Sequence, residues 1–242
     1  MAGTNVTKQK DADASLAKGF RGYKPMKEKP VRQVEMVEDE TLKKLKGAWK
    51  TVKYDGNLDV TGLYKQVLRA IEGLSHSASD VENFSIVLAE FQEERGFKGK
   101  AGMFMSALVN TCNDKEFVIH TSHITEPINY LGYESRKDII VEGDVGDNAG
   151  WAMEGGTITV KGNANHLVGC SMNAGVVIVE GNAAANVGHS VRGGSIVVKG
   201  NAGAQIGEWM VGGEIHLESG YESIGYIERG KIFHKGVLIA KK

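Results

Sequence analysis

Aliphatic residues between positions 139 and 217 recur in pairs, and each pair follows the previous one after nineteen residues. One residue separates the two members of a pair, which is the alternation of a β-strand with one buried face. Stacked at this interval, the pairs form two wholly aliphatic columns: Ile139, Ile158, Val177, Ile196 and Ile215, and Val141, Val160, Val179, Val198 and Leu217. We therefore expect one short strand per repeat, with both columns pointing inward.

Glycine follows the same period and separates the expected strands. Three series run in step: Gly143, Gly162, Gly181 and Gly200; Gly150, Gly169, Gly188 and Gly207; and Gly156, Gly175, Gly194 and Gly213. This glycine content rules out a stable helix and indicates tight turns. A fixed period of about twenty residues is typical of a solenoid, in which copies of one small unit stack.

The remaining positions of the repeat fill in the expected rung. Two more columns are apolar enough to be internal: Ala149, Val168, Val187 and Ile206, and Met153, Met172, Val191 and Met210. Asp144, Asn163, Asn182 and Asn201 form a corner column whose side chains can bond along the stack. The interior is therefore expected to be a filled core without a substrate cavity.

Residues 123–242 are thus predicted to form a right-handed parallel β-helix with 19-residue rungs. Four to five rungs at a spacing of about 4.8 Å give a rod roughly 20–25 Å long. Beyond Gly213 the period fails, since Gly220, Gly225 and Gly230 are spaced by five. Val237–Ala240 again predicts a strand, which we interpret as part of a distorted last rung.

A further column lies between the two inward positions of each strand. Its members are Ile140, Thr159, Ile178, Val197 and His216. They must face outward if their neighbours face inward. Ile140, Ile178 and Val197 are too apolar for a freely solvated face, so the column should pack against the N-terminal half of the chain or against another subunit. The sequence does not decide between these two.

The N-terminal half has a different pattern, with apolar residues at helical spacing. Residues 1–53 are predicted to be a basic extended arm with a short helix, and residues 54–122 a helical cap over the first rung. Helices are expected over residues 38–52 and 60–74, from Ser79 or Asp80 to Gly96, and over 100–112, followed by a strand at 115–120.

Charge divides the chain in the same place. The net charge is −1, but residues 1–53 carry 13 Lys and Arg against 7 Asp and Glu, and the remainder carries 16 against 23. The overall balance gives no indication of nucleic-acid or membrane binding, and the arm is either a solvated tail or a segment that docks on an acidic partner. A polar N-terminus, no long apolar run and only two cysteines favour a cytoplasmic location.

The segment Gly162-Asn163-Ala164-Asn165-His166-Leu167-Val168-Gly169, with Gly-x-x-x-x-Gly-Gly repeats around it, resembles the β-helix family named for its GXGXG motif. That family includes the C-terminal domain of the glutamate synthase large subunit and the β-helix subunit of formylmethanofuran dehydrogenase. The resemblance covers residues 137–242 well and the first half poorly. His166 departs from it, because the family usually has an acidic residue there.

The resemblance implies a scaffold that lacks catalytic groups. This chain would then bind no cofactor itself, while flavin, iron–sulfur or molybdenum/tungsten centres would belong to partner subunits. The family members named above are subunits or domains of larger oxidoreductases. Other protein subunits are therefore the expected partners.

One column carries chemistry-bearing side chains: Trp151, Cys170, His189 and Glu208. A thiol, an imidazole and a carboxylate in line can bind a metal or form a nucleophile and base. Side chains of a ladder run parallel, however, whereas metal ligands must converge on one point. A surface column, facing a partner, is the simpler interpretation.

The sequence therefore favours a non-catalytic scaffold subunit of a cytoplasmic oxidoreductase complex of the glutamate synthase or formylmethanofuran dehydrogenase type. The residues expected to face partners are Ile140, Ile178, Val197, Cys170, His189 and Glu208. Two alternatives stay open: an enzyme or metal-binding protein with its site at Cys170, His189 and Glu208, and a self-assembling binding module.

Overall fold

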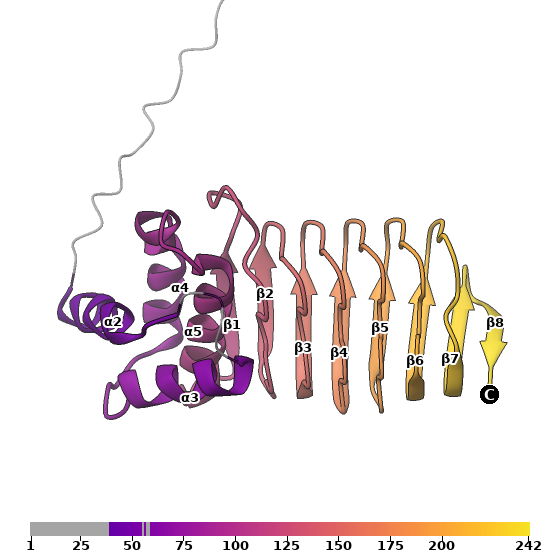
Figure 1. The fold of residues 1–242 in the computed structure, drawn as a ribbon, viewed down its shortest axis with the longest axis horizontal. Helices are drawn as coiled ribbons and strands as arrows, with labels where there is room; N and C mark the ends of the chain where they lie inside the picture. Colours follow the sequence, from indigo (N-terminus) through magenta and orange to yellow (C-terminus); the bar gives the residue numbers. More distant parts are fainter. Residues whose placement is uncertain (1–38, 55, 57–58) are drawn as a thin grey trace, which may run out of the picture. The chain divides into compact units, whose positions relative to one another are not determined.

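A computed structural model of the chain describes residues 39–54, 56 and 59–242, which belong to one compact unit (Figure 1). Most of the predicted arm, residues 1–38, lies outside the described residues. The helices are α2 (Glu40–Thr51), α3 (Val60–Ala70), α4 (Ala78–Val87), the short 3-10 helix η1 (Leu88–Phe91) and α5 (Phe97–Thr111). The strands are β1 (Glu116–His120), β2 (Asp138–Glu142), β3 (Glu154–Val160), β4 (Ala174–Val179), β5 (Ser195–Val198), β6 (Met210–Leu217), β7 (Ile227–His234) and β8 (Val237–Lys241).

All eight strands form a single sheet, and their order in the sheet is their order in the chain. Strands β1 to β7 are parallel neighbours, so the chain winds as a parallel β-solenoid with one strand of this sheet per turn (Figure 1). From β2 to β6 the pairing advances by nineteen residues, as in Ile139↔Ile158 and Ile196↔Ile215. The predicted parallel β-helix with 19-residue rungs is therefore confirmed.

The predicted inward columns are all buried. Every member of the two strand columns is at most 1% exposed, as are the members of the third and fourth columns. The four columns make an interior of aliphatic and methionine side chains. Because apolar side chains fill it from end to end, the interior of the rod is a hydrophobic core.

The corners of the solenoid explain the glycine and asparagine columns. Gly188 has φ 69°, and a Cβ there would lie 2.5 Å from Cδ1 of Ile215, so any other residue would be strained and would displace the Ile215 side chain. In the asparagine column, Oδ1 of Asn163 accepts from the backbone N–H of Asn182 at 2.9 Å, and Oδ1 of Asn182 accepts from that of Asn201 at 2.8 Å. The side chains thus link each corner to the next, as predicted.

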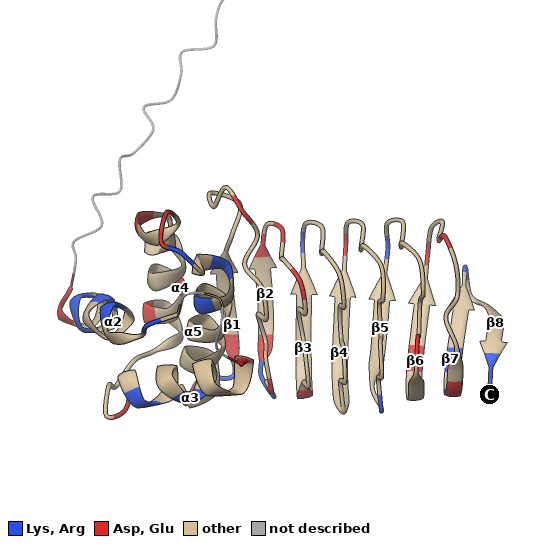
Figure 2. Cartoon of the chain, viewed as in Figure 1, with Lys and Arg blue, Asp and Glu red and all other residues tan. Residues whose placement is uncertain are grey.

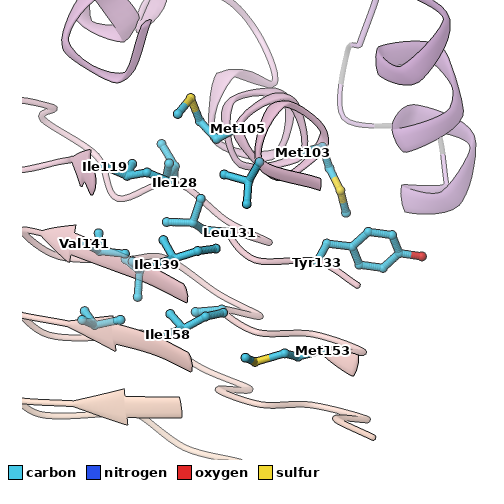
Figure 3. Packing of buried hydrophobic residues seen from close by; sticks show 14 of the residues in the cluster. Met103, Met105, Ile119, Ile128, Leu131, Tyr133, Ile139, Val141, Met153 and Ile158 are labelled. Atoms are coloured by element: carbon cyan, nitrogen blue, oxygen red, sulfur yellow. The ribbon is translucent and has the colours of Figure 1, made fainter. Parts of the chain in front are cut away.

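The N-terminal helices continue the same core beyond the first strand. Figure 3 shows Met103 and Met105 of α5 followed by Ile128 and Leu131, and then by the aliphatic side chains of β2 and β3. Helix α4 packs on β1, where Oγ of Ser85 accepts from the backbone N–H of His120 at 3.0 Å. No helix in the described part of the chain combines the length and apolarity that crossing a membrane requires.

Three details differ from the sequence-based expectations. Helix α4 begins after Ser77, whose capping box with Asp80 replaces the expected start at Ser79 or Asp80. Gly96 is the N-cap of α5, with φ 78°, rather than the end of the preceding helix. The seven parallel strands exceed the four to five expected rungs, and β8 adds no rung because it turns back antiparallel to β7.

Candidate functional site

The outward residues of the strands form a continuous face along the sheet, which we call the outer face. Its central column is Val118, Ile140, Thr159, Ile178, Val197, His216 and Phe233, paired in register from β1 to β7. Ile140 is 41% exposed, whereas Ile178 and Val197 are half-buried. None of these three belongs to the hydrophobic core that the helices and inward columns share. The described helices therefore leave the apolar column at the surface.

A column of alternating charge flanks the apolar column at the carboxyl ends of the strands. We call it the charge ladder, and it consists of Glu142, Lys161, Glu180, Lys199, Glu218 and Lys235. From Lys161 onward, the backbone N–H of each member donates to a carbonyl one turn earlier, that of the residue just before the previous ladder member. Lys199 donates to the carbonyl of Val179 at 2.9 Å, for example, and Lys235 to that of Leu217 at 2.8 Å. Figure 2 shows red and blue alternating at these strand ends.

Glu180, in the middle of the charge ladder, forms ion pairs with the lysines of both neighbouring turns. Oε1 of Glu180 lies 3.0 Å from Nζ of Lys161 and 3.4 Å from Nζ of Lys199. The hydrogen bond from Lys161 is the main reason why the pKa of Glu180 is lowered, and Lys199 adds to it. The sequence-based columns did not include these positions, although the sign of the charge alternates every nineteen residues from Glu142 to Glu218.

A third column completes the outer face on the other side of the apolar one. It consists of Asp138, Thr157, Val176, Ser195, Glu214 and Lys231. Glu214 pairs with Lys231 at 2.9 Å and with Nε2 of His216 at 3.4 Å. The imidazole of His216 in turn stacks on the ring of Phe233, with centroids 4.7 Å apart. The outer face is thus a largely apolar strip between the charge ladder on one side and, on the other, a column that is charged only towards its ends.

The column of Cys170, His189 and Glu208 shows no sign of concerted chemistry. Burial raises the pKa of the Cys170 thiol, which disfavours the reactive thiolate. The carboxylate of Glu208 accepts from the backbone N–H of Tyr226 at 2.6 Å, at the next turn of the chain. Over the described ranges, no group of three His, Cys, Asp or Glu side chains is arranged to hold a metal ion.

Trp151, at the head of that column, packs against the helical end of the solenoid. Its ring lies 5.8 Å from that of Tyr130 and 5.3 Å from that of Tyr133, measured between centroids. This aromatic group is part of the packing between the first turns of the chain. Trp151 therefore has a structural role, while Cys170, His189 and Glu208 are partly exposed at the following turns.

The helices hold an ion pair between a buried lysine and an exposed glutamate that the sequence did not predict. Lys100 is 4% exposed, and its Nζ lies 2.8 Å from Glu94 and 4.1 Å from the centroid of the Trp49 ring. Burial lowers the pKa of Lys100. Trp49 also donates to Glu94 at 3.0 Å, so the three side chains satisfy one another and fix α2 to the start of α5.

The chain matches no model of a known protein family, and no curated protein is significantly similar to it in sequence. What the fold itself defines is a parallel β-solenoid of 19-residue turns, preceded by a few helices. On its surface, the outer face carries a row of apolar side chains along the stacked strands.

Proposed function

We propose that this chain is a non-catalytic scaffold subunit of a multi-subunit cytoplasmic oxidoreductase complex. The observation that carries this proposal is the contrast between the inside and the outside of the solenoid. Its interior is filled by apolar side chains and offers no room for a substrate, while its outer face presents Ile140, Ile178 and Val197 at the surface. An apolar strip bordered by charges is the usual make-up of a protein–protein interface.

The proposed parent complex is of the glutamate synthase or formylmethanofuran dehydrogenase type, because the corner segment Gly162–Gly169 resembles the GXGXG motif of those proteins. On this proposal the coil is right-handed, and residues 1–53 supply a basic arm for an acidic partner. The helices of residues 54–122 act as a cap. Helix α4 lies on β1, and Oγ of Ser85 accepts a hydrogen bond from the backbone N–H of His120 at the edge of the sheet.

In this arrangement the chain positions other subunits and carries no cofactor of its own. Flavin, iron–sulfur or molybdenum/tungsten centres would be held by the partners. The column of Cys170, His189 and Glu208 supports this division of roles, because burial raises the pKa of the Cys170 thiol and the Glu208 carboxylate is held by the backbone of Tyr226.

Purification of the native complex from the source cells at the endogenous level tests the proposal. Mass spectrometry should identify flavin, iron–sulfur, molybdenum/tungsten or glutaminase-type subunits in a fixed ratio to this chain. Recovery of the chain with no other protein would contradict the scaffold function.

A variant with Cys170→Ala separates the scaffold from an enzyme that uses the Cys170 column. Because the thiol is half-buried and its pKa is raised, the substitution should leave both assembly and turnover of the complex unchanged. Loss of turnover with assembly intact would instead assign the chemistry to this column.

A further inference from the structure

The charge ladder has a symmetry that intramolecular pairing does not require. Six strands, β2 to β7, carry it, and it starts with a glutamate and ends with a lysine: Glu142, Lys161, Glu180, Lys199, Glu218 and Lys235. An alternating row with an even number of members is complementary to itself when it is reversed. The midpoint of the row lies between β4 and β5.

Reversal is what a twofold axis along the strand direction produces when two copies pack outer face to outer face. With the axis between β4 and β5, strand β4 faces β5 of the second copy, β3 faces β6 and β2 faces β7. Glu180 then lies opposite Lys199 of the second copy, and Lys161 opposite its Glu218. The outermost pair is Glu142 with Lys235. Every member of the ladder meets the opposite charge.

The central column is matched by the same operation. Ile178 lies opposite Val197 of the second copy, at the middle of the contact. Thr159 meets His216, so polar faces polar, and Ile140 meets Phe233, so apolar faces apolar. In the third column Asp138 meets Lys231, again with opposite charge, while Thr157 meets Glu214 and Val176 meets Ser195. One axis therefore pairs every charge of the ladder with its opposite and brings no like charges together in the third column.

Other arrangements of the same face are unfavourable. If the twofold axis ran along the rod, each strand would face itself with the charged columns exchanged, which places Glu142 against Asp138 and Glu218 against Glu214. Sliding the antiparallel pair by one strand places glutamate opposite glutamate and lysine opposite lysine. Like charges in contact across an interface disfavour both alternatives.

Deepening the scaffold function, on which this inference rests, we propose that the outer face binds a second copy of this chain in the antiparallel arrangement centred between β4 and β5. Six strands about 4.8 Å apart and about five residues deep give a flat contact of roughly 24 by 17 Å. This is small for a stable interface, so the dimer is expected to dissociate on dilution.

Sedimentation velocity on the full chain over a wide range of concentrations tests the dimer. The wild type should change from monomer to dimer as concentration rises, and Val197→Glu should shift that transition to at least tenfold higher concentration (about 1.4 kcal/mol). Asn165→Glu, which adds the same charge at an exposed corner away from the outer face, should leave the transition unchanged. A wild type that stays monomeric, or a dimer unaffected by Val197→Glu, overturns the proposal.

Inversion of the whole ladder tests the arrangement itself. The variant combines Glu142→Lys, Lys161→Glu, Glu180→Lys, Lys199→Glu, Glu218→Lys and Lys235→Glu, which preserves net charge, composition and the alternation within the chain. It should dimerise with itself as the wild type does. When it is mixed with differently labelled wild-type chain, energy transfer should report mixed dimers well below their statistical share. Mixed dimers at the statistical share overturn the antiparallel pairing.

These measurements use the chain alone, whereas the scaffold function is tested by the subunits that accompany the chain in its cells. A dimer without foreign subunits would contradict only the scaffold function. Foreign subunits together with a monomeric chain would contradict only the second copy as the occupant of the outer face.

Discussion

The positions of single residues in this solenoid, such as Gly188 at a corner, follow largely from the nineteen-residue spacing. The spacing was enough to predict the inward columns, because a strict period determines which residues stack. It also predicted that the asparagines of successive turns lie next to each other. It did not reveal that Leu167 and Trp209 take up left-handed backbone conformations, with φ 64° and 58°. Large side chains rarely do so, and only the stacking of equivalent corners imposes it.

Replacing Gly188 with alanine should destabilise the protein by about 1–3 kcal/mol. The added Cβ would lie 2.5 Å from Cδ1 of Ile215, in a backbone region with φ 69°. Urea unfolding measures the change. Gly47→Ala is the control, because Gly47 lies in helix α2 and a Cβ there has no heavy atom within 4 Å. That variant should be more stable than wild type by about 0.5–1 kcal/mol. Equal effects at the two positions would refute the account of the corner.

The charge ladder makes a prediction for acidic pH. The pKa of Glu180 is lowered in the folded chain, chiefly by its hydrogen bond from Lys161, so the folded protein holds this proton less tightly than the unfolded chain. Its contribution is therefore present above the ordinary value of 4.5 and is lost as the pH falls through the lower folded value. Glu180→Gln should unfold with a weaker dependence on pH below 4.5, as followed by circular dichroism. The exposed Glu222→Gln, outside the ladder, should keep the wild-type dependence; the same loss there would contradict the assignment to Glu180.

The sequence predicted the helices and most of the strands. It did not predict the exact start of α4, where several residues can act as the cap, or the direction of β8, which a turn determines. Four helical segments were expected and are present, because apolar residues at helical spacing are a strong signal. The N-cap of α4 was placed two or three positions too late because Ser77, Ser79 and Asp80 are all acceptable caps. Strand β8 was predicted, but its antiparallel direction depends on a turn through Lys235 and Gly236, which both have positive φ.

One buried hydroxyl joins helix α4 to strand β1. Ser85 is fully buried, donates to the carbonyl of Glu82 at 2.6 Å and accepts from the N–H of His120 at 3.0 Å. Ser85→Ala leaves that edge N–H without its acceptor and should cost about 1–3 kcal/mol.

Hydrogen exchange gives the local readout of this change, since the amide of His120 should exchange faster in the variant. Ser79→Ala is the matched control, on the same helix but exposed. An unchanged exchange rate at His120 would show that Ser85 does not protect the edge of the sheet.

The molecule as a whole has two unlike ends. At one end the helices cover β1 with a shared core, and at the other β8 is the last strand, with Val237, Leu238 and Ile239 exposed. Because each turn of a solenoid is stabilised mainly by its neighbours, a turn at an open end has support from one side only. The sequence predicted this asymmetry in outline, through the break in period after Gly213, but it did not show β7 continuing the parallel stack.

Stability should therefore fall along the rod. At concentrations where the chain is monomeric, amide protection should be greatest in β2 and β3 and decrease towards β7 and β8. Hydrogen exchange read by mass spectrometry on peptides from each turn measures the gradient. Uniform protection from β2 to β7 would mean that the solenoid opens only as a unit.

The alternation of the charge ladder also limits how such a chain can lengthen or shorten in evolution. Removal of residues 162–180, one complete turn, would preserve every aliphatic column but bring Lys161 next to Lys199. Removal or duplication of two turns at once keeps the signs in order and the number of rungs even. The aliphatic core tolerates the loss or gain of a single turn, whereas the alternation of charge on the surface is kept only when two turns are lost or gained together. Descendants of this gene should therefore differ in length by multiples of two repeats.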